Sequence, residues 1–248
     1  MNYYKSQKGF TLIEIAIVLV IIGLLLGGIL KGQELINSAR VRNLADQNSG
    51  IQAAYFGFID RYRQIPGDMD PTDACDAIGL TNLGGTGNCN AYGSGGDGDG
   101  TLDAEDYAEA SAVWDHLSGA GFIHGNYDGS ATDDATYDAD AAPVNAFGGR
   151  VMLSNTDNYV VETGTSTVRL AYLFGNQIPV SILRELDVKI DDSQPGTGVL
   201  RHTAGGAQGA NTAGDEVWST TGTCVTAGNP DIWNVDGDAG NCNAVYIY

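Results

Sequence analysis

The amino-acid sequence predicts an α+β fold, in which one long N-terminal helix packs against an antiparallel β-sheet. An apolar run at residues 10–30 is followed by helix-periodic sequence up to residue 62. The C-terminal half of the chain holds short segments of alternating apolar and polar residues, which are typical of half-buried strands. A helix followed by such strands forms layers around one core, so these observations together predict an α+β fold.

The first predicted element is an apolar helix at residues 10–30, interrupted only by Thr11 and Glu14. A helix of this length rises roughly 30 Å, which is the thickness of the hydrocarbon core of a bilayer. No small-residue cleavage site of the secretory type follows it, so a retained membrane span is favoured. Lys5 and Lys8 precede the span, and we therefore expect a cytoplasmic N-terminus with the rest of the chain outside.

Glu14 is unusual in such a helix, because a carboxylate at the centre of a bilayer costs roughly 2.5–3.5 kcal/mol. It lies near the end of the span, where the cost is smaller. A carboxylate in this position predicts a positively charged partner at the same depth.

The stretch "KGFTLIEIAIVLVIIGLLL" resembles the class III signal of type IV pilins and of the pseudopilins of type II secretion. The resemblance implies that a prepilin peptidase cleaves after Gly9 and methylates the new N-terminus at Phe10. It also implies that Glu14, the fifth residue after the cut, neutralises the new amine of a neighbouring subunit and sets the register of assembly. The implied fold is type IV pilin-like, with a long helix on an antiparallel sheet and a disulfide-closed C-terminal loop.

The sequence then divides into a leader at residues 1–9, a helix at residues 10–63 and an extracytoplasmic head at residues 64–248. Within the helix, residues 10–30 form the transmembrane or filament-core part, and the remainder packs on the head through one apolar stripe. The stripe consists of Leu44, Ile51, Tyr55, Phe58 and Tyr62. Pro66 and Gly67 end the helix.

The head is predicted to contain two short helices and several strands, separated by acidic, glycine-rich loops. The helices are expected at residues 105–118 and 179–188, and the strands at residues 150–154, 158–163, 167–174, 198–203 and 243–248. Residues 67–104 are expected to form a loop.

Charge and motifs argue against two classes of function. Residues 1–63 carry a net charge of +3, whereas residues 64–248 carry −22, so the head would repel phosphate backbones and no direct nucleic-acid binding is expected. The three histidines form no metal-binding pattern, and no nucleophile motif of the G-x-S-x-G type occurs. The absence of these metal-binding and nucleophile motifs from the sequence favours a structural protein over an enzyme.

Four cysteines occur as two local pairs in the expected extracytoplasmic head. Pairing of Cys75 with Cys89 and of Cys224 with Cys242 is the simplest of three possible connectivities. Each bond would stabilise the head by about 3 kcal/mol through loop closure. Four free thiols are the alternative, which fits poorly with an oxidising compartment.

The segment "GGDGDGTLDAED" at residues 95–106 resembles a twelve-residue calcium loop followed by a helix. The candidate calcium ligands are Asp97, Asp99, Thr101, Asp103 and Asp106. The first loop position holds glycine rather than aspartate, so a solvated acidic turn that caps the next helix is the alternative. Asp236 and Asp238 form a weaker candidate cation site.

The sequence is interpreted as a structural subunit, a pilin and possibly a minor one, of a type IV pilus-like filament. A type II secretion pseudopilin and an adhesin-like tip subunit are the alternatives. The expected partners are copies of itself, other pilins, the prepilin peptidase and an inner-membrane assembly platform. The subunit is expected in the bacterial inner membrane before assembly, and in an extracellular pilus or a periplasmic pseudopilus afterwards.

Overall fold

A computed structural model describes residues 11–79, 95–103, 106–133, 135–203 and 223–248 of the chain. It consists of two compact units, which meet within the first helix: residues 1–40 form one unit and residues 41–248 form the other. The second unit contains the predicted calcium ligands together with Cys75, Cys224 and Cys242. Three other predicted site residues lie outside the described residues: Gly9, Phe10 and Cys89.

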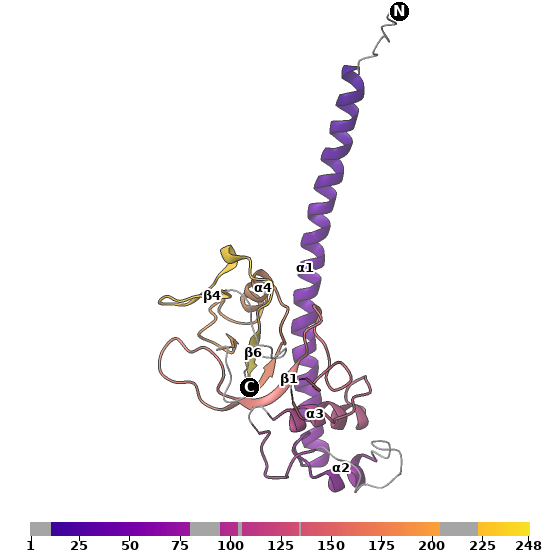
Figure 1. The fold of residues 1–248 in the computed structure, drawn as a ribbon, viewed down its shortest axis with the longest axis vertical. Helices are drawn as coiled ribbons and strands as arrows, with labels where there is room; N and C mark the ends of the chain where they lie inside the picture. The colour runs from indigo at the N-terminus through magenta and orange to yellow at the C-terminus, as the bar shows by residue number, and fades with distance from the viewer. Residues whose placement is uncertain (1–10, 80–94, 104–105, 134, 204–222) are drawn as a thin grey trace, which may run out of the picture. The chain divides into compact units, whose positions relative to one another are not determined.

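The first helix, α1, runs from Leu12 to Tyr62 and belongs to both units (Figure 1). The C-terminal half of α1 buries one face against the head, as the apolar stripe predicted. The buried residues of this face are Val41, Leu44, Asn48, Ile51, Ala54, Tyr55 and Phe58. Tyr62 is half-buried, and the helix ends there because Arg63 takes a left-handed conformation (φ 60°) shortly before Pro66.

The central sheet of the head has four antiparallel strands in the order β1–β2–β6–β3. Strands β1 (Met152–Thr156) and β2 (Arg169–Leu173) form a neighbouring pair, and β6 (Ala244–Ile247) lies between β2 and β3 (Leu200–His202). The antiparallel sheet backed by a long helix confirms the predicted α+β fold. A second, two-stranded sheet of β4 (Val225–Thr226) and β5 (Ile232–Trp233) was not predicted.

The strand predicted at residues 158–163 does not form, apart from one isolated bridge between Tyr159 and Thr203. The backbone N–H of Val160 donates to His202, whereas the N–H of Glu162 donates to Gly196. Because these bonds go to two separate segments, the chain makes no continuous ladder here. It forms a loop beside the sheet instead.

The described part of the head contains three further α-helices. Helix α2 (Pro71–Ile78) replaces part of the loop predicted at residues 67–104; Asp70 caps its first turn and Gly79 its end. Helices α3 (Tyr107–Gly119) and α4 (Val180–Ile190) agree with the predicted positions within two residues. A short 3-10 turn, η2, covers Val235–Gly237.

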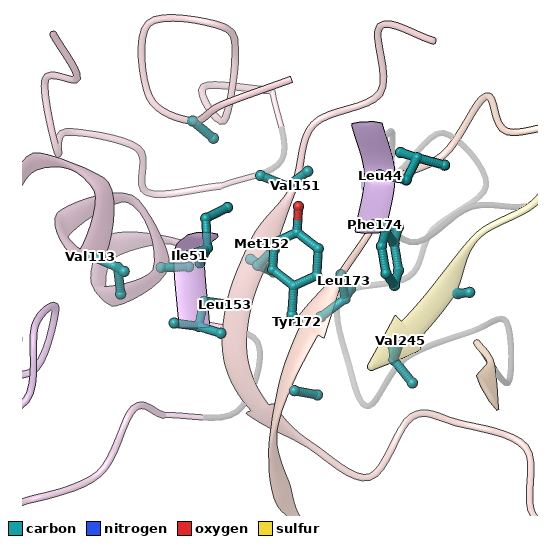
Figure 2. Close-up of a cluster of buried hydrophobic side chains, with 14 of the residues drawn as sticks. Leu44, Ile51, Val113, Val151, Met152, Leu153, Tyr172, Leu173, Phe174 and Val245 are labelled. Atoms are coloured by element: carbon teal, nitrogen blue, oxygen red, sulfur yellow. The ribbon is translucent and has the colours of Figure 1, made fainter. Parts of the chain in front are cut away.

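The core of the head lies between α1, α3 and the central sheet. Figure 2 shows Ile51 of α1 between Val113 of α3 and Leu153 of β1. Leu44 of α1 lies beside Phe174, which follows β2. Within this core the indole N–H of Trp114 donates to the hydroxyl of Tyr137 (2.8 Å). That hydroxyl donates in turn to the carbonyl of Val151 (2.9 Å), so a buried polar chain links α3 to the residue before β1.

Replacing Tyr137 with phenylalanine tests this buried chain. The variant leaves the indole N–H and the Val151 carbonyl without their partner, so the free energy of unfolding should fall by about 1–3 kcal/mol. Tyr62→Phe is the matched control, because the hydroxyl of Tyr62 forms no hydrogen bond with a described residue. Denaturant titrations of both variants measure the difference, and equal stability losses would contradict the assignment.

The stability of the head should also depend on His116, which is fully buried in α3. Its Nδ1 accepts the N–H of Gly67 (2.9 Å), and burial lowers its pKa to about 4. In the unfolded chain the pKa is about 6.5, so below that pH the unfolded state takes up a proton that the folded state rejects. Stability should therefore fall as the pH drops from about 6.5 to 4.

His116→Gln separates this contribution from that of other groups, because glutamine does not titrate and still offers an acceptor. The variant should be less stable at neutral pH, but the slope of its unfolding free energy between pH 6.5 and 4 should be shallower. A pH series of denaturant midpoints checks this, and identical slopes would refute the role of His116.

Candidate functional site

The N-terminal half of α1 presents an apolar surface that no other described residue covers. It contains a segment with a mean hydropathy of 2.9 and no buried side chain, which is long and apolar enough to cross a membrane. Large apolar side chains are exposed along its length, among them Leu12, Val20, Leu24 and Leu30. Such a surface needs lipid or other helices around it.

Glu14 lies in the first turn of α1, where it forms a capping box with Thr11. The Glu14 carboxylate oxygen Oε2 accepts the backbone N–H (2.8 Å) and the hydroxyl (2.7 Å) of Thr11. The Thr11 hydroxyl accepts the N–H of Glu14 in return (3.3 Å). The threonine three residues before a glutamate is the sequence signal for this cap, which the interpretation of Glu14 as an assembly residue overlooked.

The capping box leaves the second carboxylate oxygen of Glu14 available. No donor among the described residues bonds to Oε1, so a positive group from outside this part of the chain has an acceptor there. Glu14 can therefore close its own helix and bind a neighbouring cation at the same time. The cleavage and methylation positions Gly9 and Phe10 lie outside the described residues and remain predictions.

In the head, the structure gathers the carboxylates of Asp68, Asp97 and Glu109. One carboxylate oxygen of each lies within 4.8 Å of those of the other two. Asp68 and Glu109 are each only 4% exposed, whereas Asp97 is exposed at the rim. We call these three residues the acidic cluster.

The glycine-rich loop, residues 95–103, surrounds the side chain of Asp68 and brings Asp97 close to it. The Asp68 carboxylate accepts the N–H groups of Asp99 (3.1 Å) and Gly100 (3.0 Å), and its carbonyl accepts the N–H of Gly98 (2.8 Å). Gly98 and Gly100 have φ values of 74° and 94°, which favour glycine. At Gly96 a Cβ would lie 2.1 Å from the Cα of Asp68, so only glycine allows this approach.

Glu109 approaches the same point from the first turn of α3. Its Oε2 accepts the N–H of Asp103 (2.5 Å). Burial raises its pKa to about 7, and the nearby carboxylates of Asp103, Asp106 and Asp68 act in the same direction. Burial also raises the pKa of Asp68, and no basic side chain of the described residues pairs with the acidic cluster. A cation would relieve this repulsion.

The structure distributes the predicted calcium ligands differently from the aligned loop. Asp97 belongs to the acidic cluster, whereas Asp99 accepts the N–H and hydroxyl of Thr101 (2.8 and 2.9 Å). Asp106 caps α3 by accepting the N–H of Ala108 (2.8 Å), which is the alternative that the sequence left open for this turn. The side chain of Asp103 is not in the cluster.

Asp68 and Glu109 were missed because they lie outside the twelve-residue window. Asp68 is distant in sequence from that loop, and only the fold brings it near. Glu109 had a detectable signal: an acidic residue in the first turn of a helix, four residues before the apolar Val113, is placed on the buried face. The all-oxygen donor set suits a hard cation such as calcium.

Two other acidic groups have local roles. Asp187, Asp191 and Asp192 also lie close together, but Asp187 accepts the indole N–H of Trp233 (2.7 Å) and the N–H of Ser193 (3.1 Å). These bonds make it a link between α4 and its neighbours. Asp236 and Asp238 belong to η2 and its C-cap, and neither joins an acidic group in the described part of the head.

One of the two predicted disulfides is seen directly. Cys224 and Cys242 are bonded and close the C-terminal loop that contains β4, β5 and η2, which confirms this part of the predicted fold. Cys75 is also disulfide-bonded. Its predicted partner Cys89 lies outside the described residues, so that pairing remains a prediction.

Comparison with known proteins bears on the N-terminal segment. No curated protein and no solved structure matches the chain. Residues 4–30 match the family model described as the prokaryotic N-terminal methylation motif. That segment includes Gly9, Phe10 and Glu14 and leads into the exposed apolar half of α1. The chain therefore carries the class III signal of type IV pilins and pseudopilins at its N-terminus.

Proposed function

We propose that the protein is a structural, non-catalytic subunit of a type IV pilus-like filament. The observation that carries this proposal is the methylation motif at residues 4–30, which leads directly into a helix whose apolar surface is exposed. In the membrane, lipid covers this surface. In the filament, the same helix of other subunits replaces the lipid, and the head at residues 64–248 lies outside the helix bundle.

Glu14 supplies the polar element of this assembly. Lipid tails are as apolar as leucine, so moving an apolar helix from lipid into a bundle of helices gains little hydrophobic free energy. A charge pair in a poorly screened environment adds both attraction and a fixed register. In this proposal Oε1 of Glu14, to which no described residue donates, is the acceptor for the Phe10 amine of a neighbouring subunit, which processing after Gly9 exposes.

The prepilin peptidase and an inner-membrane assembly platform are the partners that this route requires, together with copies of the chain and other pilins. The methylation motif is shared with type II secretion pseudopilins, so a short periplasmic pseudopilus is the alternative assembly. Recovery of the chain from sheared cell surfaces favours the pilus, and confinement of the processed chain to the cell envelope favours the pseudopilus.

Calcium binding by the acidic cluster is a second proposed property of the head. Two nearly buried carboxylates and one exposed carboxylate share one point without a basic partner among the described residues. A calcium ion held by Asp68, Asp97 and Glu109 would neutralise them and fasten the glycine-rich loop to α3. The proposed role of the ion is structural, because it would join Asp68 and Asp97 to Glu109 of α3.

Three variants at the helix start separate the charge of Glu14 from its cap. Glu14→Gln keeps a capping-box residue but removes the charge, so it should reduce filament yield at least tenfold while leaving membrane insertion unchanged. Thr11→Ala breaks the cap and keeps the charge, so assembly should largely survive. Glu14→Ala removes both. Quantification of sheared filaments against membrane-inserted chain measures this, and normal filament yield in Glu14→Gln would contradict the charge role.

Calcium should raise the melting temperature of the head by about 5–10 °C when it is present at a hundredfold excess over its dissociation constant. Asp97→Asn and Glu109→Gln should abolish most of that gain, because each removes one carboxylate ligand. Asp60→Asn is the control, since Asp60 is exposed on α1 outside the acidic cluster and pairs with the exposed Arg63. Scanning calorimetry with calcium or with a chelator measures the shift, and no shift in the wild type would refute the site.

A further inference from the structure

A cavity of about 400 Å³ lies in the head beside the central sheet. Its walls are the loop that follows β1 and the segment that precedes β3, and its floor includes Ile247 of β6. The volume falls within the range of small-ligand sites in proteins. Neither the acidic cluster nor the N-terminal helix contributes to it.

Two arginines line this cavity, although basic side chains are scarce in the head. Residues 64–248 contain five basic and twenty-seven acidic residues, yet Arg169 and Arg201 both belong to the lining. Glu162 is the one acidic side chain there. Neither arginine forms an ion pair with a described residue, so two positive side chains and one negative side chain line the cavity within an acidic domain.

The register of the sheet explains why the two arginines meet. Arg201 of β3 is paired with Val245 of β6, and Ala171 of β2 is paired with Ile247 of the same strand. Paired residues and residues two apart share a face of a sheet, so Arg169 and Arg201 lie on one face, on strands that flank β6. Both long side chains therefore reach the same cavity.

Arg201 is held in place by its neighbours. Its Nε donates to the carbonyl of Gly198 (2.9 Å), and its guanidinium carbon lies 5.3 Å from the centre of the Tyr159 ring. The hydroxyl of Tyr159 donates to the carbonyl of Thr167 (2.7 Å), which fixes the ring. A guanidinium that is positioned in advance loses less entropy on binding a carboxylate, and its terminal N–H groups suit bidentate contact.

The remaining polar lining is rich in hydroxyl groups. They belong to Thr163, Thr165, Ser166 and Thr167, and to Thr197, whose hydroxyl also donates to Asp192. Hydroxyls donate and accept hydrogen bonds, so they suit a ligand that carries several hydroxyls of its own. An acidic sugar combines such hydroxyls with one carboxylate.

We propose that this cavity binds a uronic-acid-type saccharide, with Arg169 and Arg201 on its carboxylate and the loop hydroxyls on its ring. The accessibility of the site rests on the proposed filament function. Tyr248, which follows β6, also belongs to the lining, and its hydroxyl contacts Asn48 of α1 (2.9 Å). Residue alternation puts the side chains of the two arginines on the opposite face of the sheet. Binding in the assembled filament therefore requires that neighbouring subunits leave this face open.

Binding of digalacturonate to the full-length chain in detergent micelles tests this proposal by calorimetry. Digalactose, which carries hydroxymethyl groups in place of the carboxylates, should bind at least tenfold more weakly. Arg169→Gln and Arg201→Gln should each weaken digalacturonate binding about tenfold or more. Arg184→Gln is the matched control, because Arg184 is exposed on α4 outside the cavity and should leave binding unchanged.

Unchanged melting temperatures of Arg169→Gln and Arg184→Gln confirm that the comparison concerns binding rather than folding. Absence of digalacturonate binding, equal binding of digalactose, or an equal loss in Arg184→Gln would each overturn the proposal. Binding of a peptide of residues 126–140 but not of digalacturonate would also overturn it, and would assign the cavity to an acidic loop of a neighbouring head. The assay uses unassembled chain, so its failure leaves the filament assignment standing.

Discussion

The exposed apolar surface of the first half of α1 is the constraint on which the rest of the molecule depends. The apolar segment of α1 that is long enough to cross a membrane has no side chain buried against other described residues. Each large apolar side chain there would gain about 1.5–3 kcal/mol on leaving water. The chain therefore needs lipid or neighbouring helices throughout its existence. Because lipid and helix bundle are similarly apolar, the proposed function assigns the alignment of neighbouring helices to the polar group at the helix start, Glu14.

The head is subject to a different constraint: it has to fold while it carries a large negative charge. Some of its carboxylates are stabilised locally by backbone N–H groups: Asp106 accepts the N–H of Ala108 in α3, and Asp187 accepts the N–H of Ser193. Among the described residues, the acidic cluster has no basic partner, and the two arginines of the cavity form no ion pair. Uncompensated charge of either sign in a folded domain is a natural place for a ligand of the opposite sign.

The sequence was most informative where one periodicity or motif dominated. The apolar stripe of α1, the helices around residues 107–119 and 180–190, and the C-terminal disulfide were predictable because local pattern and tertiary packing agree. The prediction of a strand at residues 158–163 was wrong, because the backbone hydrogen bonds of this segment go to two separate segments and its residues form a loop. Asp68 joined the acidic cluster only through the fold, so no local pattern could have revealed it.

The mature N-terminus of the chain tests the filament account most directly. Intact-mass and N-terminal analysis of the chain from its native cells, in membrane and sheared-surface fractions, reads both processing and assembly. The account predicts a chain that begins at N-methylated Phe10 and is recovered in the sheared fraction. A chain that still begins at Met1 in every fraction would contradict it, and the protein would then be an ordinary membrane-anchored domain.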